Sequence, residues 1–258
     1  NDTKEVKLCS VFRDSYLDTG DGSFKKCNAA YAKGGPEAAI NMLNKNLDLS
    51  ITDYVTVDFN AVVECVDLLG GITLDEVTDE EAVLMQGYMD EINKLTKNNS
   101  KYLSGGGTNV TLDGVQACAY ARIRYTKGDD YKRAERQRTV LAAMVAKAQK
   151  SDLVTINKLI DAVFGDIQTS FSNTDLVALA AQVFNYKLGE SSGFPFSKNS
   201  TTLGSKGSVV VPCTLESNVI ELHQFLFGDE EYTPSDTVLA NSKKIIKDTG
   251  LNEGSGYR

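Results

Sequence analysis

Hydrophobic and polar positions in the first fifty residues predict a strand followed by a helix. Residues Glu5 to Phe12 (EVKLCSVF) alternate and then become apolar, which is typical of a strand that enters a sheet. A loop rich in glycine and aspartate follows at Asp18 to Gly22. Pro36, directly after two glycines, predicts the first turn of a helix that runs to about Leu47.

The next segments predict a strand–helix–strand unit. Asp53 to Phe59 has the pattern of a strand, and a helix is expected from Asn60, as its N-cap, to Leu69. Gly70 and Gly71 end that helix, and Ile72 to Leu74 predicts another strand. Short loops between such elements favour parallel pairing. The expected fold is therefore α/β: a layered αβα sandwich with a central mixed sheet flanked by helices.

Helices dominate the second half of the pattern. Thr78 and Glu81 have the spacing of a capping box and predict a helix start. Lys97 to Gly107 is long and polar enough to suggest a loop. No internal repeat or domain boundary is visible, so residues 1–258 are expected to form a single domain. Gly189–Ser208 is Ser/Gly-rich, and the remaining predictions are a strand at Val209–Val211 and helices at Leu112–Tyr120, Asp152–Phe164, Thr174–Tyr186, Asn218–Phe227 and Ser235–Lys247.

Composition removes several classes of function. A net charge of -8 argues against nucleic-acid binding, which usually needs a broad basic surface. The sequence contains no run of eighteen apolar residues, so it predicts no membrane span. A single histidine, His223, argues against a zinc site or a serine–histidine triad. The five cysteines show no metal spacing and are expected to be free and mostly buried, although a Cys9–Cys27 bridge is imaginable: Cys9, Cys27, Cys65, Cys118 and Cys213.

The strongest chemical signal is the segment Ala121 to Arg138 (ARIRYTKGDDYKRAERQR), which holds five arginines in an acidic chain. Alternation predicts a strand at ARIRY, with Arg122 and Arg124 on one face. Gly128, Asp129 and Asp130 predict a turn, after which a helix is expected.

Along that helix, a cationic start continues into an apolar stripe. Arg133, Arg136 and Gln137 lie on adjoining turns, and the stripe continues through Leu141, Met144, Val145 and Ala148. Such a face is often only a solvated surface followed by a core contact. It also suits an amphiphile with an anionic head and a hydrocarbon tail, because arginine binds phosphate oxygens bidentately. The neighbouring aspartates are a plausible magnesium platform.

A second pair of candidate residues, Arg13 and Asp14, follows the first strand directly. In α/β proteins the ends of strands often carry functional side chains.

Four segments in order resemble one family. They are VFRDSY at Val11–Tyr16, CNAAYAKGGPEAAI at Cys27–Ile40, DYVTVDFNAVVECVDLLGGI at Asp53–Ile72 and LDGVQACAYARIRYTKGDDYKRAERQ at Leu112–Gln137. With them the chain resembles the extracytoplasmic catalytic domain of the LytR-CpsA-Psr family of cell-wall glycopolymer ligases. The likeness runs from about Glu5 to Lys187.

The resemblance implies a phosphotransferase. Such an enzyme moves a glycopolymer (teichoic acid, or a capsular or secondary wall polysaccharide) from a polyprenyl-pyrophosphate carrier onto peptidoglycan. It implies work at the extracytoplasmic face of the cell membrane of a Gram-positive-type bacterium, with possible pyrophosphatase side activity. Phosphoryl transfer depends mainly on positioning and charge neutralisation, which several arginines with Mg²⁺ (or Mn²⁺) would provide.

The family's pattern also implies roles for individual residues, and an apolar lipid pocket between sheet and helices. The pyrophosphate is expected to bind Arg13, Arg122, Arg124, Arg133 and Gln137. The catalytic residues are expected to be Asp130, Arg13 and Arg122, with Asp130 acting as base or as metal support. Asp130 and Asp14 are the candidate metal ligands. Arg13, Arg122, Arg124 and Arg133 are expected to converge on one pyrophosphate, with Arg136 a borderline case and Arg138 on another face.

One departure affects these expectations. The family carries a serine–aspartate pair on a strand that precedes the first strand of this chain, and that aspartate helps to bind magnesium. The chain is therefore expected to lack that first strand, and also an upstream helix that would anchor it to the bacterial membrane. Two other classes stay open: a polyprenyl-pyrophosphate hydrolase that uses water, and a non-enzymatic lipid- or glycan-binding regulator of the cell envelope.

Overall fold

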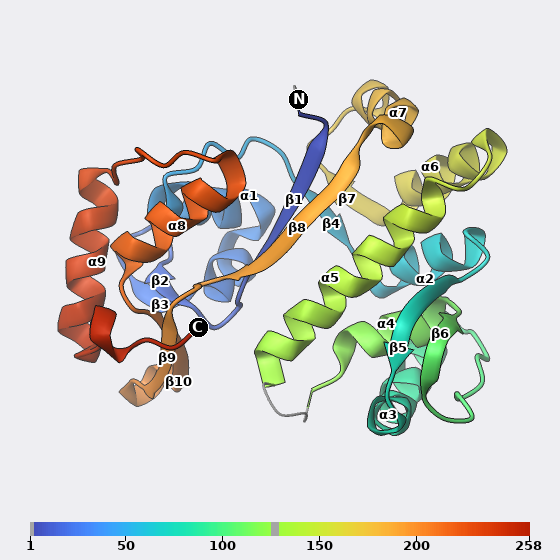
Figure 1. Ribbon diagram of the computed structural model, residues 1–258, viewed down its shortest axis with the longest axis horizontal. Coiled ribbons are helices and arrows are strands. Elements are labelled where there is room, and N and C mark those ends of the chain that lie inside the picture. Colours follow the sequence, from blue (N-terminus) through green and yellow to red (C-terminus); the bar gives the residue numbers. More distant parts are fainter. Residues whose placement is uncertain (1–2, 125–128) are drawn as a thin grey trace. The chain divides into compact units, whose positions relative to one another are not determined.

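A computed structural model describes residues 3–124 and 129–258, except for the side chains of residues 129–130 and 163–166. The chain divides into two compact units, Asn1–Leu8 with Val55–Ser191 and Cys9–Tyr54 with Ser192–Arg258. Strands β1 (Glu5–Val11) and β8 (Lys187–Phe194) pair with each other, and each passes from one unit into the other (Figure 1). That the whole chain acts as a single catalytic domain stays a prediction.

The described helices of the first unit lie in one continuous stretch of chain, Val55–Ser191. Two short strand pairs, β4–β7 and β5–β6, are both antiparallel. The elements are β4 (Val55–Val57), α2 (Phe59–Leu68), β5 (Ile72–Val77), α3 (Asp79–Thr96), β6 (Gly107–Leu112), α4 (Gly114–Arg122), α5 (Asp129–Ala148), α6 (Leu153–Asp166), β7 (Ile167–Thr169), α7 (Asn173–Ala181) and a 3-10 helix (Val183–Asn185).

The α/β class is confirmed, but the expected pairing direction is wrong. Within the described part of the chain, the two strands of the predicted unit, β4 and β5, do not pair with each other: β4 pairs with β7 and β5 with β6, both antiparallel. Among the described residues the strands form five two-stranded sheets in place of one central sheet. The β5–β6 pair buries Ile72, Leu74 and Leu112 against helices, whereas no residue of the β4–β7 pair is buried.

Side-chain caps decide where the helices of this unit begin. Asp58, and not Asn60, is the N-cap of α2, because its carboxylate accepts a hydrogen bond from the backbone N–H of Ala61. The predicted capping box of Thr78 and Glu81 is confirmed at the start of α3. A further box, Asp113 with Gln116, starts α4.

The strand predicted at Ala121–Tyr125 is wrong as far as the described residues extend. Helix α4 continues through Arg122, and the backbone leaves helical geometry only at Ile123, whose ψ is 128°. The helix persists because its buried face, which includes Cys118 and Ala119, packs into the core beside α3. Arg122 and Arg124 therefore lie in the last turn of a helix and just beyond it. Tyr125 lies outside the described residues.

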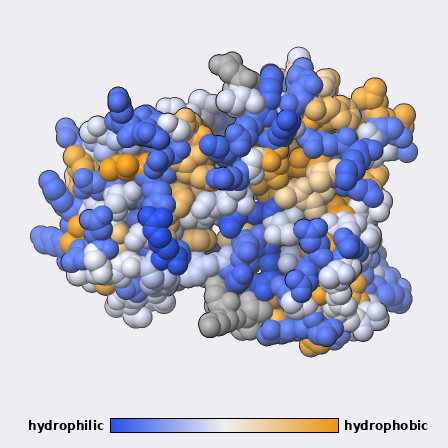
Figure 2. All heavy atoms as spheres, viewed as in Figure 1, coloured by the Kyte–Doolittle hydropathy of each residue, from blue (hydrophilic) through white to orange (hydrophobic). Residues whose placement is uncertain are grey.

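The core of the first unit forms around α3. Met85, Met89 and Ile92 are fully buried there, against Leu74 and Leu112 of the β5–β6 pair. By contrast, α7 buries none of its residues, and Figure 2 shows hydrophobic residues exposed where this helix lies. No helix in the described part of the chain combines the length and the apolar composition needed to cross a membrane.

The second unit packs three long helices around two hairpin-like strand pairs. Its core includes Tyr16, Leu47, Phe194, Val211 and Leu215. The elements are β2 (Tyr16–Asp18), β3 (Phe24–Lys26), α1 (Asn28–Leu47), β9 (Lys198–Thr202), β10 (Ser208–Pro212), α8 (Leu215–Phe227), α9 (Asp236–Thr249) and 3-10 helices at Gly204–Lys206 and Glu253–Ser255.

Two predictions for this unit have different outcomes. The helix entry at Pro36 is confirmed, because α1 is broken at Gly34 and Gly35, and Gly35 has a φ of +67° that favours glycine. The Ser/Gly-rich composition of Gly189–Ser208 predicted no element there, but strands are present. That segment contains the end of β8 and all of β9, whose serines and threonines pair with the valines of β10.

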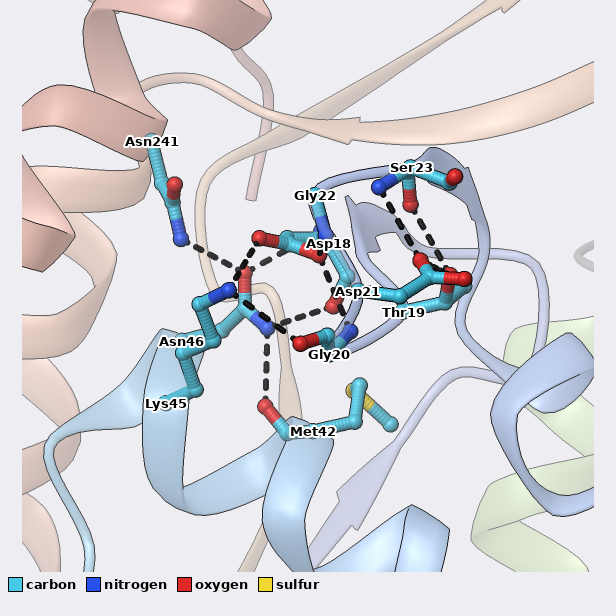
Figure 3. Close-up of polar contacts among 10 residues, drawn as sticks. All are labelled: Asp18, Thr19, Gly20, Asp21, Gly22, Ser23, Met42, Lys45, Asn46 and Asn241. Atoms are coloured by element: carbon cyan, nitrogen blue, oxygen red, sulfur yellow. Dashed lines mark hydrogen bonds and ion pairs between the residues drawn. The ribbon is translucent and has the colours of Figure 1, made fainter. Parts of the chain in front are cut away.

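The aspartate- and glycine-rich loop is the turn of the β2–β3 hairpin (Figure 3). Asp18 Oδ1 accepts hydrogen bonds from the backbone N–H groups of Gly20 and Gly22, at 2.9 and 2.8 Å. Its other oxygen lies 2.8 Å from Lys45 Nζ. Asn46 exchanges two hydrogen bonds with the backbone of Asp18. The buried carboxylate is thus neutralised and held by its own unit, which stabilises the hairpin.

The prediction of free, mostly buried cysteines is confirmed: Cys27, Cys118 and Cys213 are buried, and Cys9 and Cys65 are half-buried. Burial raises the pKa of the Cys27 thiol to about 12 and that of Cys118 to about 11.

Timed alkylation should separate these two groups. A small alkylating agent is expected to modify Cys9 and Cys65 in the native protein, and the three buried thiols only after unfolding. Peptide mass spectrometry measures this order. Modification of Cys27 before loss of the native circular dichroism signal would contradict it.

Candidate active site

An apolar cavity of about 340 Å³ lies in the first unit, between α2, α4 and α5. Its wall is mainly hydrocarbon and sulfur, with Val62, Cys65, Cys118, Val140, Leu141 and Met144 among the lining residues. Two of the residues predicted to bind the head group, Arg122 and Gln137, line the same cavity. Polar groups at the edge of an apolar space are what an amphiphilic ligand needs.

The apolar stripe predicted along α5 faces cavities over its length. Leu141 and Met144 line the cavity described above. Val145 lines a second cavity of about 420 Å³, and Ala148 lines a third of about 240 Å³ beside α6 and α7. The stripe therefore borders hollow apolar surface as well as packed core.

Arg122 is the most closely defined cation of this site. Its guanidinium lies over the ring of Phe59 at 4.5 Å and over Tyr88 at 5.3 Å, both measured to the ring centroid. Nη2 lies 3.0 Å from Glu91 Oε2, and Nη1 is enclosed without a hydrogen-bond partner. An arginine whose guanidinium contacts two aromatic rings keeps its charge beside the cavity.

The other predicted residues of this unit lie close in the chain to these two. Arg124 is half-buried and directly follows the buried Ile123, while Arg133 is half-buried and lies one turn before Gln137 on α5. The side chain of Asp130 lies outside the described residues. The convergence of these groups on one pyrophosphate stays a prediction.

Arg136 serves a different purpose from the one its sequence position suggested. Its Nε lies 2.8 Å from Glu81 Oε1, and the two side chains are only 7% and 13% exposed. Its Nη1 donates to the carbonyl oxygen of Ile123 at 3.4 Å. The guanidinium is therefore committed to a buried ion pair and is not available for a phosphate.

Arg138, expected on a different helix face from Arg133, is half-buried with its Nε and Nη1 enclosed. It is unsuitable as a neutral reference.

Arg13 and Asp14 belong to the second unit. Arg13 Nε lies 3.2 Å from Asp14 Oδ1, and Lys26 Nζ lies 2.9 Å from Asp14 Oδ2. The thiol of Cys27 donates to the Arg13 carbonyl oxygen, which fixes the backbone at this point. Sequence reasoning missed Lys26, although it directly precedes the motif that starts at Cys27. Glu91 and Phe59 had no sequence signal of their own.

Binding of magnesium or manganese stays a prediction. The described residues contain no group of three His, Cys, Asp or Glu side chains placed to hold a metal. Each carboxylate oxygen of Asp14, a predicted ligand, lies beside a cation: Arg13 at one oxygen and Lys26 at the other.

Comparison with known proteins gives a consistent result. Residues 1–198 match the model of the LytR_cpsA_psr family. The polyisoprenyl-teichoic acid–peptidoglycan teichoic acid transferase TagU of Enterococcus faecalis (strain ATCC 700802 / V583) is 32% identical over 180 residues, which are 69% of this chain and 54% of that protein. TagV of Bacillus subtilis (strain 168), a transferase of the same name, is 31% identical over 80% of this chain and 49% of its own length.

Solved structures agree in fold. The crystal structure of B. subtilis TagV superposes with a TM-score of 0.67 at 26% identity, covering 90% of this chain and 86% of that one. The chain spans about half the length of the two curated relatives.

Proposed function

Because the chain belongs to the LytR_cpsA_psr family, we propose that it transfers a glycopolymer from a polyprenyl-pyrophosphate carrier onto peptidoglycan. The observation that carries the proposal is the apolar cavity with the fixed guanidinium of Arg122 at its wall. The two relatives described above, both named teichoic acid transferases, support teichoic acid as the class of polymer. The reaction would take place on the extracytoplasmic side of the cell membrane, where peptidoglycan lies.

The cavity and its polar residues would divide the substrate between them. The polyprenyl tail would replace water along Val62, Val140 and Met144, and each buried methylene contributes about 0.8 kcal/mol. The pyrophosphate would lie against Arg122 and Gln137. A charge-assisted hydrogen bond contributes about 1.5–3 kcal/mol, so one arginine has a measurable share of the affinity.

The transfer step is a displacement at phosphorus. A hydroxyl oxygen of peptidoglycan forms a bond to the glycan-linked phosphorus, and the bond from that phosphorus to the bridging oxygen breaks. Polyprenyl phosphate leaves with that oxygen and its electron pair. Arg122 would neutralise charge on the phosphate oxygens throughout, which is the main contribution a protein makes to phosphoryl transfer. The hydroxyl proton would pass to a base, for which Asp130 is our candidate.

Magnesium or manganese enters this proposal only through Asp130. No step is assigned to a metal ion.

Removing the guanidinium of Arg122 should test the proposal directly. Arg122→Ala is expected to lower transfer of radiolabelled glycan phosphate onto peptidoglycan by at least about tenfold, because a charge-assisted contact is lost. Lys94→Ala, which removes an exposed cation from α3, is the matched control and should change little.

Three results of this assay would count against the transferase. Equal activity of Arg122→Ala and wild type would remove the head-group site. Release of inorganic phosphate with no glycan attached to peptidoglycan would favour the hydrolase. Lipid binding without any turnover would favour the non-enzymatic regulator.

A further inference from the structure

Glu91 is the carboxylate that pairs with Arg122. Its Oε2 lies 3.0 Å from Arg122 Nη2, and its side chain is 52% exposed, against 23% for the arginine. We propose that Glu91 is an internal counter-ion: it stays paired with Arg122 while the site is empty, and the phosphate of the substrate displaces it. This inference rests on the proposed function, because it takes the ligand of Arg122 to be the anionic head group of that substrate.

The two partners of this ion pair differ in how firmly their side chains are held. Arg122 is held by the rings of Phe59 and Tyr88, and it leaves the last turn of a helix whose neighbours are packed. Glu91 is a half-exposed residue of α3 whose carboxylate returns to water when it swings away. When the pair opens, the guanidinium therefore stays in place and the carboxylate leaves. An exposed carboxylate that leaves such a pair loses little, since exposed ion pairs are weak.

The cavity explains why a counter-ion is useful at this place. Arg122 lines an apolar space, and its Nη1 is enclosed without a hydrogen-bond partner. A cation beside apolar surface is costly unless it is paired. Glu91 supplies the missing negative charge in the free protein, and a phosphate group would supply it in the complex.

The exchange creates selectivity for the head group. A pyrophosphate or a phosphate brings its own negative charge and can offer two oxygens to the guanidinium fork. An uncharged alcohol of the same chain length cannot replace the carboxylate, so it would bind with the Glu91–Arg122 pair intact. Glu91 therefore acts as a specificity-determining residue and does not take part in the bond changes.

The neighbouring Asp90 provides a matched control on the same helix. Its Oδ1 accepts a hydrogen bond of 2.6 Å from the hydroxyl group of Tyr102, on the loop that follows α3. Glu91→Gln and Asp90→Asn each remove one negative charge, and the two positions are adjacent in the chain. Only the change at Glu91 removes the counter-ion of Arg122.

The test measures binding of a short-chain polyprenyl pyrophosphate, the monophosphate and the alcohol by isothermal titration calorimetry. Glu91→Gln and Glu91→Asp should bind both phosphates about two- to fivefold more tightly than wild type, because the competing ion pair is lost or cannot form. Binding of the alcohol should be unchanged, and Asp90→Asn should match wild type for all three ligands. Thermal melting of each variant checks that it is folded.

Arg122→Ala makes the two hypotheses distinguishable. If Arg122→Ala weakens binding of the pyrophosphate but both Glu91 variants bind it as wild type does, or less tightly, the counter-ion proposal is wrong and the head-group site stands. If Arg122→Ala has no effect on pyrophosphate binding either, the proposed function loses its head-group site as well. A gain for the alcohol equal to the gain for the phosphates would also overturn the role of Glu91 in selectivity.

Discussion

Glu81→Ala should lower the free energy of unfolding by about 3–5 kcal/mol, because it leaves the buried guanidinium of Arg136 without its carboxylate. The pair is among the least exposed of the ion pairs in the described residues, with Arg136 Nε 2.8 Å from Glu81 Oε1. The same carboxylate also accepts a hydrogen bond from the Thr78 backbone in the capping box of α3. Removing it therefore also weakens the start of that helix.

Urea denaturation followed by circular dichroism measures this effect. Glu80→Ala is the control, since Glu80 is exposed in the same first turn of α3 and should change stability by less than about 0.5 kcal/mol. A double variant, Glu81→Met with Arg136→Met, should recover part of the loss, because an apolar pair of similar volume avoids a buried unpaired charge. Equal effects of Glu81→Ala and Glu80→Ala would show that the pair contributes nothing beyond a surface contact.

The pair also has a consequence for the candidate site. Arg136 donates to the carbonyl oxygen of Ile123, the residue between Arg122 and Arg124. The ion pair thus links the start of α3, the middle of α5 and the exit of α4. Loosening it should disturb the two arginines even though Glu81 has no role toward the ligand.

Local sequence signals predict the start of α3, where two side chains form a capping box, but place the N-cap of α2 two residues too late. The box of Thr78 and Glu81 was read directly from its spacing, and the structure confirms it. The box at Asp113 and Gln116 has the same chemistry, and it explains why the segment through Arg122 is helical. Two alternating arginines are too few to establish a strand when a capped helix precedes them and Tyr120 and Ile123 are buried.

Properties that depend on distant residues could not be predicted in this way. The antiparallel register of β5 and β6 brings together segments that lie on either side of the whole of α3. The burial of Arg136 depends on Glu81, a residue 55 positions earlier in the chain. From the sequence alone, Arg136 on an amphipathic helix looks the same as Arg133. The counter-ion Glu91 is hidden for the same reason, since nothing near it in the chain points to Arg122.

The family resemblance implied an apolar pocket between sheet and helices, and the residues themselves indicated only an apolar stripe; the cavity lies between the three helices α2, α4 and α5. The stripe on α5 predicted that Leu141 and Met144 face apolar surroundings, and they do. Whether such surroundings are packed or hollow depends on the sizes of residues from α2 and α4, such as Ala61 and Ala121. A hollow forms where small side chains from three helices meet, and periodicity along one helix cannot show it.

Filling this cavity should abolish tight lipid binding. Cys65→Trp places an indole in the space of about 340 Å³, because Cys65 is half-buried and lines it. If the indole excludes about four methylene groups of the polyprenyl tail, the loss is about 3 kcal/mol, or on the order of a hundredfold in Kd. The fold should tolerate the change better than it would in a packed core, where added volume costs about 1–3 kcal/mol.

Cys65→Ala, which adds no volume, is the control and should bind the polyprenyl pyrophosphate as wild type does. Wild-type protein offers a second readout, because bound lipid should protect Cys65 from alkylation while Cys9, which does not line the cavity, remains reactive. Fluorescence titration with a polyprenyl pyrophosphate and timed alkylation with and without it measure the two effects. If Cys65→Trp is folded and binds the lipid with unchanged affinity, the tail lies elsewhere. The cavity beside Arg122 would then not be the lipid site, whatever the effect of Arg122→Ala on the head group.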